Sequence, residues 1–342
     1  MDKRILMVTD FYDLEVYKDS GTPTLKYFHE TLCNQFQVVT ITPKRPPRKL
    51  DWLRYVWDMC DYDCSDIDLV YGAGCTSTYI AAHLGRKFGI PSIGRLYGTY
   101  LYPHLNDPLM LTIKFEETLA FKAKCTKYII TNDGTRGNLV ADHFGIPKED
   151  LYFLRNGVEN LHRGVYENGT LIIIAISRLE KWKRVDRIIK AFNSCLYLNA
   201  KLYIVGDGPE RDHLTELAGD NLGKKIFFMG QVPREKAEHC LSRADIFIST
   251  NDYSNVSNSL LQAMSLGKCC IVLRSGDEVI DHMVTGLVAE TKEDLSRLLQ
   301  LAVTNKELRL KLGQAALDYA RYHFETWDSR IFREVNIVKG LL

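Results

Sequence analysis

The chain has 342 residues, with 44 Lys and Arg against 43 Asp and Glu and a formal net charge of +1. This length suits two domains better than one hydrophobic core, and the near-zero charge gives no general attraction to nucleic acid. No apolar run approaches the roughly 20 residues of a membrane-spanning helix. The opening "MDKRILMVTD" predicts a first strand rather than a signal peptide.

Short apolar runs alternate with amphipathic stretches along the whole chain, a pattern typical of repeated βα units and parallel sheets. In the first half the predicted strands are Arg4–Thr9, Gln37–Ile41, Ile67–Tyr71, Pro91–Arg95, Lys127–Thr131 and Leu151–Leu154. In the second half they are Leu171–Ser177, Leu202–Val205, Ile226–Met229, Ile246–Ser249, Cys269–Leu273 and Gly286–Ala289. The stretch "VDRIIKAF" places Val185, Ile188, Ile189 and Phe192 on one face of a helix.

A domain boundary is predicted in the polar, glycine-bearing segment Asn156–Thr170. We therefore expect an α/β fold of two Rossmann-like domains, residues 1–160 and 170–324, facing each other across a ligand-binding cleft. The amphipathic residues 325–342 are expected to form a helix that crosses back and packs on the first domain.

Nine cysteines are scattered through the chain, several of them in apolar segments. An odd number of cysteines without a regular spacing favours reduced, buried thiols over a disulfide framework. Reduced thiols in turn indicate a cytoplasmic protein. Cys60 and Cys64 have no matching second pair, which speaks against a zinc site.

The segment "ISRLEKWKRVDRIIKAF" places two cations, Arg178 and Lys183, just after a predicted strand. Ligands of open α/β sheets lie beyond the carboxyl ends of the strands. Together the guanidinium and the ammonium are suited to hold a phosphate. The alternative is a solvated basic loop, since Lys181 and Arg184 lie in the same segment.

In "LYIVGDGPERDHL" two glycines, Gly206 and Gly208, follow a strand, but the third glycine of a dinucleotide fingerprint is missing. A tight strand-to-helix turn is the favoured interpretation.

Two charged segments have weaker functional interpretations. The acidic residues of Asp61–Asp68 are of the type that binds Mg²⁺, but they precede a strand, so a solvated loop is favoured. The basic segment Lys44–Arg54 is either a peripheral contact with an anionic membrane or a solvated loop, with neither favoured.

The stretch "STNDYSNVSNSLLQAMSLGKC" predicts a strand end, a polar loop and a helix capped by Ser257 or Asn258. The amino end of such a helix suits a diphosphate. Gln262, one turn further on, can hydrogen-bond hydroxyl groups but carries no charge.

Taken in order, these segments resemble the retaining glycosyltransferase family four, which has the GT-B fold. "RNGVEN" resembles the family's Asn-Gly-Val-Asp, and "ISRLEKWKRVDRIIKAF" resembles its Gly-Arg-Leu…Lys-Gly…Asp segment. "SLLQAMSLGKCCIV" is similar to its Leu-Leu-Glu-Ala-Met-Ala-x-Gly-x-Pro-Val-Ile. The resemblance covers most of the chain and is strongest from Asn156 onward.

The resemblance implies a nucleoside-diphosphate sugar donor (GDP-, UDP- or ADP-linked) held by the second domain. It also implies a glycan, lipid or other hydroxyl acceptor at the first domain, and retained anomeric configuration, with no metal or other cofactor. Arg178 and Lys183 would clamp the diphosphate, with backbone N–H groups of Asn258 and Ser259. Gly21 would approach the donor from the first domain, and Val232 would lie near its base.

Three positions depart from the family pattern. Ser254 and Gln262 stand where the family has its pair of glutamates, of which the first contacts the donor sugar and the second the ribose. Tyr97 replaces the histidine of a first-domain His-Gly and is a candidate on the acceptor or sugar side. Two alternatives therefore stay open: a nucleotide-sugar epimerase of the same fold, and a non-catalytic protein that binds sugar nucleotides or glycans.

Overall fold

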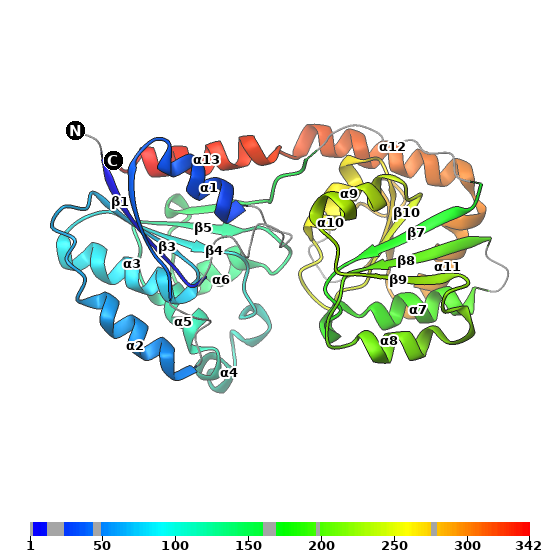
Figure 1. Ribbon diagram of the computed structural model, residues 1–342, viewed down its shortest axis with the longest axis horizontal. Helices are drawn as coiled ribbons and strands as arrows, with labels where there is room; N and C mark the ends of the chain where they lie inside the picture. The colour runs from blue at the N-terminus through cyan, green and yellow to red at the C-terminus, as the bar shows by residue number, and fades with distance from the viewer. Residues whose placement is uncertain (1–2, 12–23, 44–48, 160–168, 196–198, 275–278) are drawn as a thin grey trace. The chain divides into compact units, whose positions relative to one another are not determined.

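The computed structural model describes residues 3–11, 24–43, 49–159, 169–195, 199–274 and 279–342. These residues divide into two compact units, one comprising Met1–Asn156 with Trp327–Leu342 and the other Gly157–Thr326. Each unit is an α/β layer structure around a six-stranded sheet (Figure 1). The predicted class of two Rossmann-like domains is thereby confirmed.

The sheet of unit 1 has the strand order β2-β1-β3-β4-β5-β6, and every pairing in it is parallel. Its strands are β1 (Arg4–Thr9), β2 (Gln37–Ile41), β3 (Leu69–Ala73), β4 (Ser92–Leu96), β5 (Lys127–Thr131) and β6 (Leu151–Leu154). The strands are short and rich in apolar residues because a parallel sheet is buried on both faces.

The helices of unit 1 cover both faces of this sheet (Figure 1). They are α1 (Thr24–Cys33), α2 (Lys49–Cys60), α3 (Cys75–Phe88), α4 (Pro108–Ile113), α5 (Phe115–Lys122), α6 (Gly137–His143) and α13 (Trp327–Lys339). Alternate strand residues face opposite helices: Ile5 packs in the cluster with α1 and α13, and Leu6 in the cluster with α3.

Helix α13 belongs to unit 1 although it ends the chain. Its residues Ile331, Val335 and Val338 are buried in the same hydrophobic cluster as Phe28 of α1. This spacing is the helical repeat that places apolar side chains on one face.

The sheet of unit 2 has the order β12-β11-β10-β7-β8-β9, again with parallel pairings. Its strands are β7 (Leu171–Ile176), β8 (Ala200–Val205), β9 (Ile226–Gly230), β10 (Ile246–Ser249), β11 (Cys269–Leu273) and β12 (Leu287–Ala289). Every predicted strand of the chain is present, with its ends displaced by two residues at most.

The helices of unit 2 are α7 (Val185–Ser194), α8 (Arg211–Ala218), α9 (Arg234–Ser242), α10 (Asn258–Ser265), α11 (Lys292–Thr304) and α12 (Lys306–His323). One hydrophobic cluster joins α7, α8 and α11 to one face of the sheet, and a second joins α9, α10 and α12 to the other. The predicted apolar face of α7 is confirmed, since Val185, Ile188, Ile189 and Phe192 are all buried.

The acidic segment Asp61–Asp68 lies at the amino end of β3, away from the carboxyl ends of the strands. Asp68 precedes β3 and pairs with Lys3 (Nζ–Oδ1 2.8 Å), and Asp66 pairs with Arg4. Within the described ranges there is no group of three or more His, Cys, Asp or Glu side chains placed to hold a metal ion. Of Lys44–Arg54, residues 44–48 lie outside the described residues, and membrane contact there stays a prediction.

All nine cysteines are free thiols, and burial raises the pKa of the Cys125 thiol to about 12. No helix formed by the described residues is both long enough and apolar enough to cross a membrane.

Candidate functional site

In unit 2 the sheet has its topological switch point between β7 and β10. From β7 the chain proceeds outward through β8 and β9, whereas β10, β11 and β12 lie on the other side. Because the strands are parallel, the loops after β7 and β10 emerge side by side at the carboxyl edge. This is the position at which open α/β sheets bind ligands.

The loop after β7, residues 177–184 (here the β7 loop), carries both predicted phosphate-binding cations. The Arg178 side chain is 70% exposed, and its Nη1 lies 2.8 Å from Oε1 of Glu180. The Nζ of Lys183 lies 3.9 Å from the centre of the Trp182 ring. Both cations thus lie in the loop at the carboxyl edge, Arg178 beside a carboxylate and Lys183 beside an aromatic ring.

Two glycines hold the β7 loop against the next strand end. Gly206 has φ 130°, and a Cβ at this position would lie 1.9 Å from the carbonyl oxygen of Ser177. The backbone N–H of Leu179 donates to the carbonyl oxygen of Asp207 at 2.9 Å. The "GDG" segment therefore forms a close-packed turn, which agrees with the predicted structural role.

Helix α10 begins at the same edge. The Ser257 hydroxyl accepts from the N–H of Leu260 and caps the helix, and the Ser259 hydroxyl donates to the carbonyl oxygen of Ile176 at 3.0 Å. The second contact fixes the first turn of α10 to the end of β7. The N–H groups of Asn258 and Ser259 lie in that first turn, where a helix offers donors and a positive dipole end to an anion.

The two positions at which the family has glutamates lie in different environments. Gln262 is 8% exposed, and its Oε1 accepts a hydrogen bond from the backbone N–H of Glu159 at 2.9 Å. Ser254 lies in the loop after β10, residues 250–257 (here the β10 loop), with φ 58°. Its carbonyl oxygen accepts from Nδ2 of Asn251 at 3.2 Å. A non-glycine residue held in this left-handed region is often part of a functional site.

The remaining predicted residues are not in the β7 loop, the loop after β10 or α10. Val232 follows β9 and packs, half-buried, against the core of unit 2. Tyr97 lies in unit 1, and Gly21 lies outside the described residues. The structure therefore brings together Arg178, Lys183, Ser254, Asn258, Ser259 and Gln262 in unit 2.

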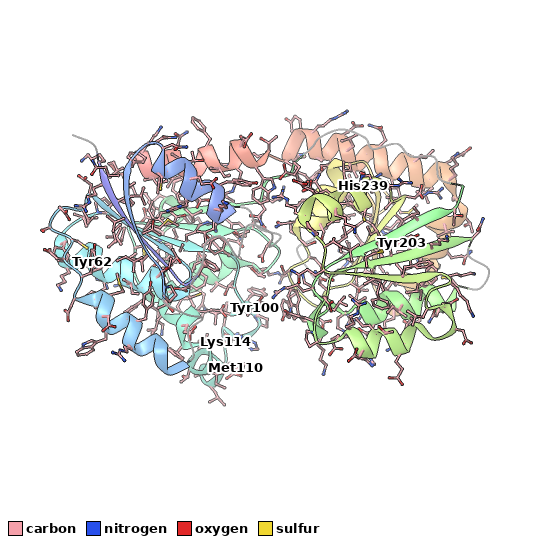
Figure 2. The ribbon with its side chains drawn as sticks, in the orientation of Figure 1. Tyr62, Tyr100, Met110, Lys114, Tyr203 and His239 are labelled. Atoms are coloured by element: carbon pink, nitrogen blue, oxygen red, sulfur yellow. The ribbon has the colours of Figure 1, made fainter. Side chains whose placement is uncertain are left out.

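In unit 1, Tyr97 follows β4 and is half-buried. The Arg95 guanidinium lies 4.2 Å from the centre of its ring, and Phe11 packs edge-on at 5.5 Å. Burial raises the pKa of Tyr97 even though Arg95 lowers it, so the phenol is protonated at neutral pH. Beyond it, Tyr100 is 43% exposed with Lys114 above its ring (Figure 2).

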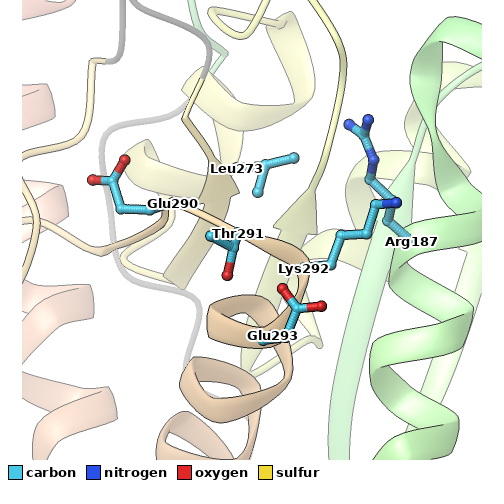
Figure 3. Close-up of a pocket in the computed structure, with 6 residues that line it drawn as sticks. All are labelled: Arg187, Leu273, Glu290, Thr291, Lys292 and Glu293. Atoms are coloured by element: carbon cyan, nitrogen blue, oxygen red, sulfur yellow. The ribbon is translucent and has the colours of Figure 1, made fainter.

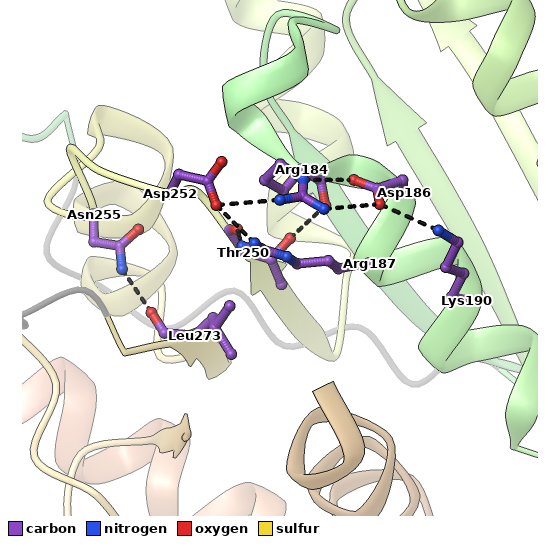
Figure 4. Close-up of polar contacts among 8 residues, drawn as sticks. All are labelled: Arg184, Asp186, Arg187, Lys190, Thr250, Asp252, Asn255 and Leu273. Carbon is purple, nitrogen blue, oxygen red and sulfur yellow. Dashed lines mark hydrogen bonds and ion pairs between the residues drawn. The ribbon is translucent and has the colours of Figure 1, made fainter. Parts of the chain in front are cut away.

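A polar network that the sequence did not predict joins the β7 and β10 loops (Figure 4). Asp252 accepts from Nη2 of Arg187 at 2.7 Å and from Nη1 of Arg184 at 3.4 Å. The rings of Trp182 and Tyr253 stack with their centres 4.6 Å apart. The one available signal was Arg184, which stands where the family motif has a glycine.

An open pocket of about 400 Å³ lies beside this network (Figure 3). Its lining residues are Arg187, Leu273, Glu290, Thr291, Lys292 and Glu293. The pocket is at the carboxyl ends of β11 and β12 and contains none of the predicted site residues. Of the residues that line the pocket, Glu290 is already paired with Arg274 at 2.7 Å, so its charge is compensated.

Comparison with known proteins finds similar sequences and similar structures. Residues 160–318 match the sequence profile described as "Glycosyl transferases group 1". An uncharacterized glycosyltransferase of Methanocaldococcus jannaschii is 33% identical over 175 residues, which span 49% of this chain and 44% of that protein. The N-acetyl-alpha-D-glucosaminyl L-malate synthase of Bacillus anthracis is 24% identical over 88% of this chain and 80% of its own length.

Solved structures agree on the fold. Anabaena HepE, crystallised in complex with UDP and glucose, matches with a TM-score of 0.73 and 16% identity over 100% of both chains. The profile match, the relatives and the double Rossmann-like architecture lead to one conclusion. The chain has the GT-B fold, its second half matches the glycosyl transferases group 1 profile, and as a whole it resembles glycosyltransferase family four.

Proposed function

We propose that this protein is an active, retaining glycosyltransferase that moves a sugar from a nucleoside-diphosphate sugar to a hydroxyl acceptor without a metal ion. One observation carries the proposal. Arg178 and Lys183 emerge at the same sheet edge as the first turn of α10, which Ser259 fixes to the end of β7. Two cations and a helix amino end at one sheet edge support a diphosphate site there.

The proposed chemistry follows from the charge of the leaving group. As the bond between the anomeric carbon and the phosphate oxygen breaks, negative charge develops on the diphosphate. Cations and N–H groups that are already in place stabilise this charge, and such preorganised electrostatics is usually the largest catalytic contribution. The acceptor oxygen bonds to the anomeric carbon on the same face, and its proton passes to the departing phosphate oxygen.

Gln262 and Ser254 are proposed to contact the ribose and the donor sugar. With its Oε1 bonded to Glu159, Gln262 has its amide nitrogen as the group to offer a ribose hydroxyl. Ser254 is short and would reach a sugar hydroxyl directly or through a water molecule. These neutral contacts are weaker than those of the family's carboxylates, so most donor affinity must come from the diphosphate.

UDP is the first choice of nucleotide, because Anabaena HepE has been crystallised with UDP. The Bacillus anthracis relative carries N-acetyl-alpha-D-glucosaminyl in its name, which supports an α-linked product and an amino sugar among the donors to test. The acceptor is proposed to be a glycan, a lipid or another small hydroxyl compound held by unit 1.

An epimerase is disfavoured by the state of the one carboxylate in the β10 loop. Such an enzyme needs a carboxyl group that exchanges protons with the sugar. Asp252 is held in ion pairs with Arg187 at 2.7 Å and with Arg184 at 3.4 Å, which leaves it badly placed to serve as that group. A binding protein without activity is disfavoured by the paired placement of Arg178 and Lys183.

Isothermal calorimetry with UDP, GDP and ADP, in the presence of EDTA, tests the proposed site. We expect one of the three diphosphates, UDP first, to bind at least about tenfold more tightly than its monophosphate, because the second phosphate adds charge-assisted contacts. Equal affinity for mono- and diphosphates, or no binding of any of them, would contradict the proposal.

A further inference from the structure

The β7 and β10 loops are connected at several points, all close to the predicted donor-binding residues. The Thr250 hydroxyl donates to the carbonyl oxygen of Arg184 at 2.8 Å. The backbone N–H of Asp252 donates to the carbonyl oxygen of Trp182 at 2.9 Å. With the stacked rings of Trp182 and Tyr253, these contacts make the two loops one packed structure.

Arg184 is unusual in its backbone conformation. It is the residue before α7, with φ 51° and ψ 38°, in the left-handed region that disfavours side chains with a Cβ. A glycine would adopt this conformation without strain. The arginine side chain must therefore make contacts that offset the strain.

Those contacts are charged and reach both loops (Figure 4). Nε and Nη2 of Arg184 donate to the two carboxylate oxygens of Asp186 at 3.0 and 3.2 Å. Its Nη1 donates to Asp252 at 3.4 Å. Partial burial works to raise the pKa of Asp186, but Arg184 and Lys190 outweigh it and the pKa is lowered. The bidentate pair fixes the guanidinium in a position from which it reaches the β10 loop.

Arg187 completes the connection from the first turn of α7. Its Nη1 donates to the carbonyl oxygen of Thr250 at 3.1 Å, and its Nη2 lies 2.7 Å from Asp252. Ser254, two residues beyond Asp252, is the second non-glycine residue with positive φ in these loops. Asp252 thus connects Arg184 to the segment of the β10 loop that carries Ser254.

We propose that Arg184 is a positioning residue that fixes the β10 loop, with Ser254, against the β7 loop, with Lys183, so that the donor sugar meets a preformed surface. The inference rests on the proposed function of this edge. Preforming a loop removes the entropy cost of ordering it when the donor binds. The diphosphate depends less on the tether, because the first turn of α10 is fixed separately by Ser259.

The test compares Arg184→Gly and Arg184→Lys with Lys190→Ala. Glycine suits the left-handed backbone, so the first variant should fold. Lys190 also pairs with Asp186, at 3.5 Å, but its side chain is 59% exposed, which makes it a matched control. Amide hydrogen exchange is measured for each protein. Calorimetry then gives the affinity of each protein for UDP and for one UDP-sugar, whichever of UDP-glucose, UDP-galactose and UDP-N-acetylglucosamine the wild type binds most tightly.

In Arg184→Gly we expect faster amide exchange at residues 252–254 and unchanged exchange in α10. The affinity for the UDP-sugar should fall about fivefold, a typical effect of uncoupling contacting residues, while the affinity for UDP changes less than about twofold. Arg184→Lys should recover part of the difference, and Lys190→Ala should resemble wild type.

Wild-type exchange and wild-type UDP-sugar affinity in Arg184→Gly would overturn the tether, as would an equal loss of UDP and UDP-sugar binding. Failure of the wild type to bind UDP or any of the three sugars would instead refute the proposed function. Faster exchange in Arg184→Gly would in that case still demonstrate the connection between the loops.

Discussion

Arg178 and Lys183 are the two side chains on which the donor-site assignment depends most. Arg178→Ala and Lys183→Ala are each expected to weaken binding of the nucleoside diphosphate by about 1.5–3 kcal/mol, the range for a lost charge-assisted contact. The measurement is calorimetric titration of UDP into each variant at fixed ionic strength.

Lys190→Ala serves as the control, because it removes an exposed cation from α7 of the same unit. Its affinity for UDP should stay within about 0.5 kcal/mol of wild type. If the UDP affinities of Arg178→Ala and Lys183→Ala also stay within that range, the diphosphate does not bind to these two side chains.

Asp10 gives a prediction about pH and stability. Its carboxylate accepts from the N–H groups of Thr76 and Ser77 at 2.9 and 2.8 Å, at the start of α3. Burial raises its pKa to about 6, against the lowering effect of these hydrogen bonds. The folded protein therefore binds this proton more tightly than the unfolded chain, and stability falls as the pH rises from about 4 to 6.

Asp10→Asn should remove this dependence. We expect the difference in unfolding free energy between pH 4 and pH 7 to shift by about 2–3 kcal/mol relative to wild type. Urea titrations at both pH values measure it, and comparison with wild type cancels the other titrating groups. Parallel stability profiles would show that Asp10 is hydrated in the folded protein.

At the residue scale, short-range patterns were predictable and long-range pairs were not. The capping role of Ser257 follows from its position before an apolar helical repeat, and the sequence left Ser257 and Asn258 as alternatives that the structure resolves. The pairing of Asp252 with Arg184 spans 68 positions in the chain. The two residues meet because β7 and β10 are neighbours in the sheet, and no local sequence pattern specifies that adjacency.

Among the secondary-structure elements, α13 combines a hydrophobic face with a buried charge. Glu334 is 1% exposed and accepts from Nε of Arg95 at 3.0 Å and from Nη1 of Arg330 at 2.7 Å. Tyr71 also donates to it. Burial would raise the pKa of Glu334, but the two guanidinium groups outweigh it and hold the pKa below its ordinary value.

Glu334→Gln should destabilise unit 1 by about 3–5 kcal/mol, because it leaves two buried guanidinium groups without their counter-charge. Phe332→Ala on the same helix is the control, since Phe332 is 56% exposed and should cost less than about 0.5 kcal/mol. Urea unfolding monitored by circular dichroism compares them. Similar midpoints for both variants would mean that the ion cluster contributes little.

The strands were the most predictable elements, because their apolar runs are bounded by polar and glycine-containing segments. The strand order was not predictable, since nothing in a single run specifies its neighbour in the sheet. The burial of Glu334 was also hidden, because its partner Arg95 is 239 positions away. In the sequence it is simply a polar residue within an amphipathic helix.

For the molecule as a whole, we propose that sugar transfer proceeds without the family's glutamate pair and without a metal. The most direct measurement is nuclear magnetic resonance of UDP-glucose, UDP-galactose and UDP-N-acetylglucosamine incubated with wild type and with Lys183→Ala, each with excess EDTA. We expect wild type to release UDP from at least one donor, with an α-configured product, and Lys183→Ala to be at least about tenfold slower. Turnover that requires added Mg²⁺ or Mn²⁺, an inverted product, or equal rates for the two proteins would contradict the account.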